Sequence, residues 1–124
     1  MRKNFLMVTL RKIPFMISYE FGDVVLLHVF PYSDLKSGKK RPALVLADTG
    51  DRDLLLCRIT SEFARDDVDI PLTHWKDNGL LLPSTVRVAK MASLEKNLVA
   101  KKLGRLGSPD RRKIRSALKK LFLF

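Results

Sequence analysis

The chain has only one cysteine and no apolar run long enough to cross a membrane. Cys57 has no second cysteine to pair with, which excludes an intramolecular disulfide and fits a reducing compartment such as the cytoplasm. A membrane-spanning helix needs roughly 18–20 apolar residues, and no run approaches that length. Residues 1–16 begin with positive charge, but Arg11 and Lys12 interrupt their apolar part. Because no small-residue cleavage site follows, we do not expect a signal peptide.

Acidic residues are scarce in the last third of the chain. Residues 1–86 hold twelve Lys and Arg against eleven Asp and Glu, whereas residues 87–124 hold twelve against two. Nearly all of the net charge of +11 therefore lies in the C-terminal part. A basic surface attracts polyanions, such as nucleic acid, an acidic protein or an anionic membrane. A solvated helix face has the same composition, so the charge alone does not decide between these readings.

Short apolar or alternating runs predict a mainly β fold, and 124 residues suit a single domain. Polar turns containing Gly38, Gly50 or Asn78–Gly79 separate the runs. Strands this short and this closely spaced are typical of a small antiparallel barrel or sandwich. The predicted strands are the Val/Leu/Phe run before Pro31 and residues 41–47, 54–61, 67–72 and 84–90.

The C-terminal sequence SPDRRKIRSALKKLF predicts an amphipathic helix. Ser108 is expected to cap it, with Pro109 at the first helical position and an acid in the first turn. Ile114, Ala117, Leu118 and Leu121 follow helical spacing and should pack on the sheet, while Arg111, Arg115 and Lys119 should point outward. The preceding segment, residues 93–107, fits either a helix or a last strand bent at Gly104.

Four segments, in their order along the chain, resemble the PemK/MazF family of toxin endoribonucleases. They are GDVVLLHVFPYSD, KKRPALVLAD, LCRITS and GLLLPSTVRVAKMASLEKNLVAKKLGRLGSPD. The resemblance covers roughly Tyr19 to Leu121, and it implies an SH3-like antiparallel barrel, as in PemK and CcdB, with a C-terminal helix. Residues 99–106 should then be mostly strand. Residues 19–124 should form the toxin domain, and residues 1–18 an N-terminal extension whose first fifteen residues are dispensable.

The resemblance also implies a function, namely the toxin of a type II toxin–antitoxin system. Members of this family are endoribonucleases that cleave single-stranded RNA, such as mRNA, and the attacking group is the RNA's own 2′-hydroxyl. The reaction needs a base for the 2′-hydroxyl proton, cations beside the phosphorane and a proton donor for the 5′-oxygen. We therefore expect a cytoplasmic enzyme with no cofactor and no metal. The resemblance further implies a homodimer inhibited by an acidic antitoxin protein.

The resemblance assigns the catalytic residues to Arg41, Thr60 and Ser61. Arg41 matches the family's arginine in the R-P motif, and its planar guanidinium suits two phosphate oxygens. Thr60 matches the family's active-site threonine, and Ser61 is expected to assist it. Lys39 and Lys40 precede Arg41 and are expected to bind RNA. The structural alternatives are an arginine that pairs with a surface carboxylate and a threonine that caps the end of a strand.

Arg87 matches a basic residue that some relatives use beside the phosphate, and both Arg87 and the nearby Lys90 are expected to bind RNA. Relatives often carry an acid just after this arginine, but Ala89 and Lys90 stand there in this chain. A carboxylate base must therefore come from elsewhere, and Asp34 is the candidate. Two other functions stay open at this point. One is a CcdB-like toxin that binds gyrase, and the other is a nucleic-acid-binding barrel without catalysis.

Overall fold

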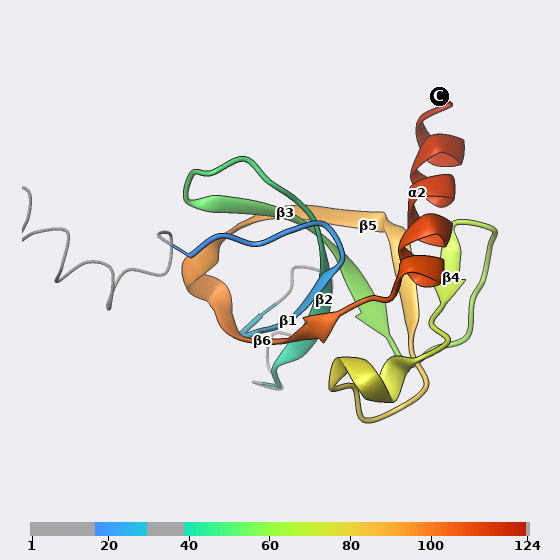
Figure 1. Ribbon diagram of the computed structural model, residues 1–124, viewed down its shortest axis with the longest axis horizontal. Helices are drawn as coiled ribbons and strands as arrows, with labels where there is room; N and C mark the ends of the chain where they lie inside the picture. The colour runs from blue at the N-terminus through green and yellow to red at the C-terminus, as the bar shows by residue number, and fades with distance from the viewer. Residues whose placement is uncertain (1–16, 30–38, 124) are drawn as a thin grey trace, which may run out of the picture.

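The computed structural model describes residues 17–29 and 39–123, which form one antiparallel sheet of six strands and a C-terminal helix (Figure 1). The helix α2 spans Ser108–Phe122, and two short 3-10 helices, η3 and η4, span Trp75–Asn78 and Lys96–Leu98. The strands are β1 (Asp23–Leu27), β2 (Arg41–Asp48), β3 (Asp53–Thr60), β4 (Asp69–Pro71), β5 (Thr85–Glu95) and β6 (Val99–Arg105).

The predicted mainly β fold with a C-terminal helix is confirmed, and so is the strand at 99–106. The strand order is β4-β5-β3-β2-β1-β6. Within the described strands, the two edges, β4 and β6, do not pair with each other, so the sheet curves like a barrel without closing. Pro71 of β4 lacks an N–H group, which limits how far that edge could extend the hydrogen bonding.

Strand β1 is shorter than its apolar run predicts, because the two strands beside it do not extend past Leu27. Leu27 lies opposite Arg41 on one side and Val99 on the other, and these are the first residues of β2 and β6. The next residue, His28, is exposed, and its N–H donates only to the Leu98 carbonyl. Among the described residues, neither β2 nor β6 extends past Leu27 to pair with the next residues of the chain.

The sheet buries an apolar cluster on each face. The larger cluster contains Leu44, Cys57, Ile59 and Val86 and lies under α2, which contributes Ile114 and Ala117. The smaller cluster lies on the opposite face. Its buried members are Val25, Leu27, Ala43, Val45, Leu54 and Leu56. Cys57 is completely buried, and burial raises the pKa of its thiol, so it is an inert core residue.

Helix α2 packs by its apolar stripe, as the sequence predicts, but its N-terminus differs. Gly107, not Ser108, is the N-cap, and the Ser108 hydroxyl instead accepts a hydrogen bond from Arg112. Asp110 is buried, and its carboxylate accepts hydrogen bonds from the N–H and hydroxyl of Thr73. The helix thus begins where a buried acid ties it to the segment after β4.

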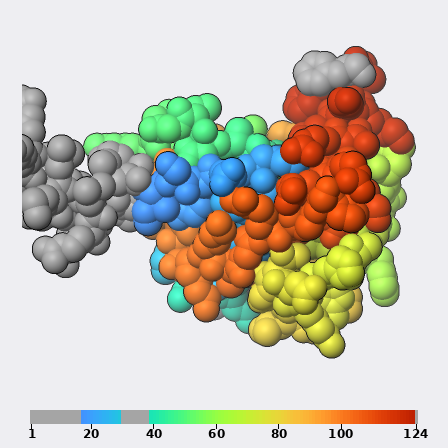
Figure 2. All heavy atoms as spheres, in the orientation of Figure 1, coloured from blue at the N-terminus to red at the C-terminus, as the bar shows by residue number. Residues whose placement is uncertain are grey.

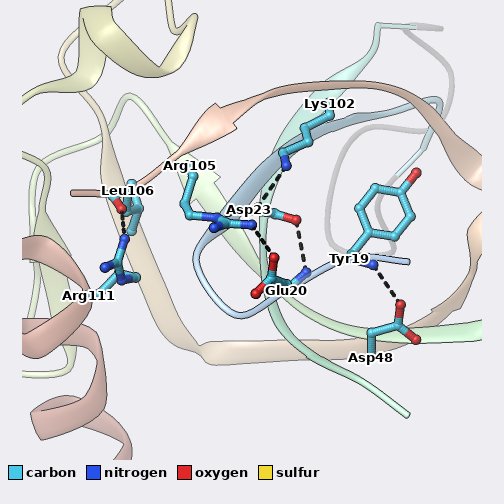
Figure 3. Close-up of polar contacts among 8 residues, drawn as sticks. All are labelled: Tyr19, Glu20, Asp23, Asp48, Lys102, Arg105, Leu106 and Arg111. Atoms are coloured by element: carbon cyan, nitrogen blue, oxygen red, sulfur yellow. Dashed lines mark hydrogen bonds and ion pairs between the residues drawn. The ribbon is translucent and has the colours of Figure 1, made fainter. Parts of the chain in front are cut away.

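Arg111 does not point away from the sheet, contrary to the sequence prediction. Its guanidinium donates to the Leu106 carbonyl (Figure 3). Its side chain also lies against Gly22, which has φ of +94°, and a Cβ at Gly22 would come 2.7 Å from Arg111 Cδ. Only glycine fits this turn before β1, because it accepts the positive φ and the close approach. Arg115 is exposed, with its guanidinium 4.8 Å from the Phe21 ring centroid.

Figure 2 shows the overall shape that results. Helix α2, in red, stands at one end of the molecule, with the segment around η3, in yellow, below it and β6, in orange, beside it. In the part of the chain that the structure describes, no helix is long and apolar enough to cross a membrane.

Candidate functional site

The β2–β3 hairpin brings the predicted catalytic residues together at its open end. Ala43 lies opposite Arg58, and continuing that antiparallel register by two residues places Arg41 opposite Thr60. In Figure 1 this open end lies near η3, whereas the turn between the strands lies on the far side of the sheet. Arg41 begins β2 and Thr60 ends β3, so both side chains sit on rigid strand ends rather than in loops.

A pocket of about 420 Å³ lies at this end of the hairpin. Its walls include Arg41, Thr60 and Ser61, and the segment Gly79–Leu82 closes another side. Four of the lining residues are basic, namely Lys40, Arg41, Arg58 and Lys101, and none of the described residues that line it is acidic. Because no described carboxylate lines the pocket, the charges of its described residues favour an anion.

The Arg41 side chain is half-buried, and its Nε atom is buried without a hydrogen-bond partner among the residues that the structure describes. No carboxylate of residues 17–29 or 39–123 pairs with Arg41, so the alternative of a surface ion pair is not found in that part of the chain. A buried N–H of a charged group without an acceptor costs stability. An arginine kept in this state is suited to receive an anionic ligand.

Thr60 is almost completely buried, and its Oγ1 accepts a hydrogen bond of 3.2 Å from the Glu62 N–H. The capping role considered as its structural alternative is therefore real. The hydroxyl hydrogen, however, has no acceptor among the described residues and stays available to a ligand. Ser61 follows in the same pocket wall and is exposed.

Of the remaining predicted residues that the structure describes, only one lines this pocket. Lys40 lines it and Lys39 does not, although both are exposed at the start of β2. Arg87 is buried opposite Arg58 and does not line the pocket. Lys90 lies in a bulge of β5, between the residues opposite Arg58 and Cys57, and is also outside the pocket wall. The candidate base Asp34 lies outside the described residues.

Two of the four basic residues in the pocket, Arg58 and Lys101, were missed by the sequence interpretation. Arg58 could have been found, because strict alternation along β3 puts Leu54, Leu56, Arg58 and Thr60 on one face. Lys101 reaches the pocket only because β6 pairs with β1, where it lies opposite Leu26. A local sequence pattern does not predict this contact, because β1 and β6 are far apart in the sequence.

Within residues 17–29 and 39–123, no three His, Cys, Asp or Glu side chains gather closely enough to hold a metal ion. The polar groups of the pocket are guanidinium, ammonium and hydroxyl groups, which bind anions.

The fold is shared with solved structures of bacterial toxins. An endoribonuclease solved with its cognate antitoxin, from a mycobacterial species, aligns with a TM-score of 0.70 at 17% identity, over 86% of this chain and 97% of that chain. The Mycobacterium tuberculosis toxin MazF-mt6 aligns with 0.67 at 17% identity, over 82% and 97%. A MazE–MazF complex from Deinococcus radiodurans gives 0.67 at 22% identity, over 87% and 99%. At such low identity these matches establish a common fold.

The sequence itself identifies the family. Residues 20–122 match the sequence profile of the PemK-like, MazF-like toxins of type II toxin–antitoxin systems, and the chain belongs to this family. Comparison with curated protein sequences gives no significant match.

Proposed function

We propose that this protein is the toxin of a type II toxin–antitoxin pair and cleaves single-stranded RNA with the pocket at the open end of the β2–β3 hairpin. The observation that carries the proposal is the buried Nε of Arg41, which has no hydrogen-bond partner among the described residues and lies in a pocket whose described lining has four basic residues and no acidic one. A phosphodiester has the charge and the paired oxygens that an arginine binds best. Membership in the toxin family supports RNA as the source of that phosphodiester.

In the proposed reaction, the ribose 2′-oxygen forms a bond to phosphorus as the bond from phosphorus to the 5′-oxygen breaks. The products are a 2′,3′-cyclic phosphate, or its 3′-phosphate hydrolysis product, and a 5′-hydroxyl. Arg41 binds the non-bridging oxygens and stabilises the charge that grows on them. Thr60 donates its free hydroxyl hydrogen to the same phosphate, with Ser61 beside it. The 2′-hydroxyl proton leaves to a base, for which Asp34 is the candidate, and the 5′-oxygen takes up a proton.

The proposed partners are an acidic antitoxin and a second copy of the toxin, in the cytoplasm. Two of the similar structures are complexes, one with a cognate antitoxin and one of MazE with MazF, which supports the antitoxin. Light scattering at micromolar concentration should give the mass of a dimer, and a monomer would contradict this part of the proposal.

The experiment that tests the activity is incubation of purified protein with a long single-stranded RNA, with and without EDTA, followed by mapping of the new ends. We expect cleavage that EDTA leaves unchanged, with 5′-hydroxyl ends. Cleavage lost in EDTA and restored by magnesium would contradict the proposal. Salt-sensitive binding without cleavage would instead identify a silent RNA-binding protein, and neither binding nor cleavage would favour a gyrase-directed toxin.

A further inference from the structure

Two arginines face each other across neighbouring strands of the sheet. Arg58 of β3 lies directly opposite Arg87 of β5, on the face that also carries Thr60 and Thr85 as the next opposed pair. Like charges directly opposite each other in an antiparallel pair destabilise it. A folded protein tolerates such a pair where acidic side chains neutralise it or where it binds an anion.

Only one of the two arginines is neutralised. Arg87 Nε lies 3.7 Å from Asp69 Oδ1, and its Nη1 lies 3.7 Å from Glu62 Oε1. Arg58, in contrast, has no carboxylate within ion-pair distance among the described residues. It is half-buried, so water screens its charge less well than that of a fully exposed side chain. The unbalanced charge of the pair therefore belongs to Arg58.

The position of Arg58 connects it to the proposed reaction site. It lines the same pocket as Arg41, and it precedes Thr60 by two residues on the same face of β3. Two residues along a strand span about 6.6 Å. A phosphate bound by Arg41 and Thr60 therefore leaves room at Arg58 for a different phosphate of the same RNA strand.

We propose that Arg58 binds the phosphate next to the cleaved bond and so positions the RNA. The inference rests on the proposed RNA cleavage and adds a subsite to it. Arg58 holds the neighbouring phosphate in place and takes no part in proton transfer. Its removal should weaken the binding of substrate much more than the chemical step.

The test uses a short RNA that contains one of the bonds found to be cleaved in a long RNA. A second oligonucleotide of the same sequence carries a neutral methylphosphonate in place of the phosphate next to that bond. The variants are Arg58→Gln and Arg58→Lys. The control is Arg52→Gln, which removes the same charge from the turn at the opposite end of the hairpin. We expect Arg58→Gln to raise KM about tenfold or more with kcat nearly unchanged, while Arg58→Lys keeps most of the affinity because a point charge suffices for one phosphate.

Two further readouts separate a binding role from a structural one. For the wild type, the neutral linkage should raise KM by the same factor as Arg58→Gln does on the unmodified RNA. For Arg58→Gln, the neutral linkage should leave KM almost unchanged, because the substitution and the neutral linkage remove the same interaction. Binding to a non-cleavable all-2′-O-methyl strand is measured at several salt concentrations. The slope of log affinity against log salt should be smaller for Arg58→Gln than for the wild type by about 0.7, the value for one phosphate contact on a single strand. The melting temperature of Arg58→Gln should equal or exceed that of the wild type, since the like-charge pair is gone.

The outcomes distinguish the two proposals. Suppose that the wild type cleaves RNA, that Arg58→Gln has the same KM as Arg52→Gln, and that the neutral linkage raises KM equally in both. The proposed subsite is then wrong, and the proposed activity stands. If the wild type cleaves no RNA, the proposed activity fails, and binding to the 2′-O-methyl strand still decides on Arg58. An unchanged salt slope in Arg58→Gln would overturn the subsite in that case.

Discussion

Lys96 Nζ lies 3.1 Å from Asp48 Oδ1, and the two side chains are only 2% and 4% exposed. Asp48 also accepts a hydrogen bond from the Tyr19 N–H (Figure 3). It accepts another from the Gly50 N–H, so it joins the chain before β1 to the β2–β3 turn. Removing one partner of a buried ion pair leaves the other charge uncompensated, at a cost of about 3–5 kcal/mol.

We therefore expect Lys96→Met to lower the free energy of unfolding by about that amount, measured by denaturant titration. Lys120→Met is the matched control, because Lys120 pairs with the exposed Asp67 at 2.9 Å and exposed pairs contribute little. Equal, small effects of the two substitutions would show that the buried pair does not support the hairpin.

The same carboxylate predicts how stability changes with pH. Burial alone raises the pKa of Asp48, but the hydrogen bonds from Tyr19 and Gly50 and the pair with Lys96 outweigh it and hold the pKa below its ordinary value. The unfolded chain then takes up the proton at a higher pH than the folded chain, so this stabilisation is present above about pH 4 and is lost as the pH falls further. Asp48→Asn should flatten the decline of melting temperature with acid between about pH 5 and 3, whereas an unchanged slope would contradict this assignment.

The N-terminal extension gives a third prediction. The sequence resemblance begins near Tyr19, and Met16 offers a start just before it. A chain without residues 1–15 keeps the Tyr19 N–H that donates to Asp48 at 2.8 Å, so its melting temperature and cleavage rate should match those of the full chain. Deletion of residues 1–20 is the control and should lower the melting temperature. A large loss in the shorter deletion would show that the run FLMVTL forms a structural element.

Thr60 gives a prediction about the chemical step. Thr60→Ala removes the proposed donor to the phosphate and should slow cleavage by roughly ten- to a thousandfold, the scale of one positioned hydrogen bond in a transition state. Thr60→Ser keeps the hydroxyl and should keep most of the rate. Because the Oγ1 atom also accepts the Glu62 N–H, melting temperatures must be compared. A loss of stability without a loss of rate would leave Thr60 with its capping role alone.

Local patterns predicted much of this fold. Alternation and turn residues located β2 and β3 nearly to the residue, and helical spacing identified Ile114 and Ala117 as core residues of α2. The polar ends of the hairpin were predicted to meet, and Arg41 and Thr60 line one pocket, although their role there stays a prediction. Antiparallel pairing of two adjacent strands is a local property, which is why the sequence is informative here.

The features that depend on distant segments were not predictable in the same way. The end of β1 at Leu27 is set by where β2 and β6 begin, and Lys101 enters the pocket through a strand pair that joins opposite ends of the chain. Whether the sheet closes into a barrel likewise depends on whether the edge strands β4 and β6 pair, which local patterns do not determine. The Ser108 cap was wrong because the helix starts one residue earlier than expected, so Ser108 is already helical and Gly107 takes the N-cap position.

The most direct test of the account is the cleavage rate of Arg41→Ala on a single-stranded RNA in the presence of EDTA, measured beside its melting temperature. Arg41 lies at the start of β2 without an ion pair among the described residues, so the fold should not depend on its charge. We predict no measurable cleavage at a wild-type melting temperature, and poor rescue by Arg41→Lys, because an ammonium group does not reproduce two parallel hydrogen bonds to a phosphate. Cleavage by Arg41→Ala at the wild-type rate, at the same bonds, would place the reaction elsewhere and contradict the account.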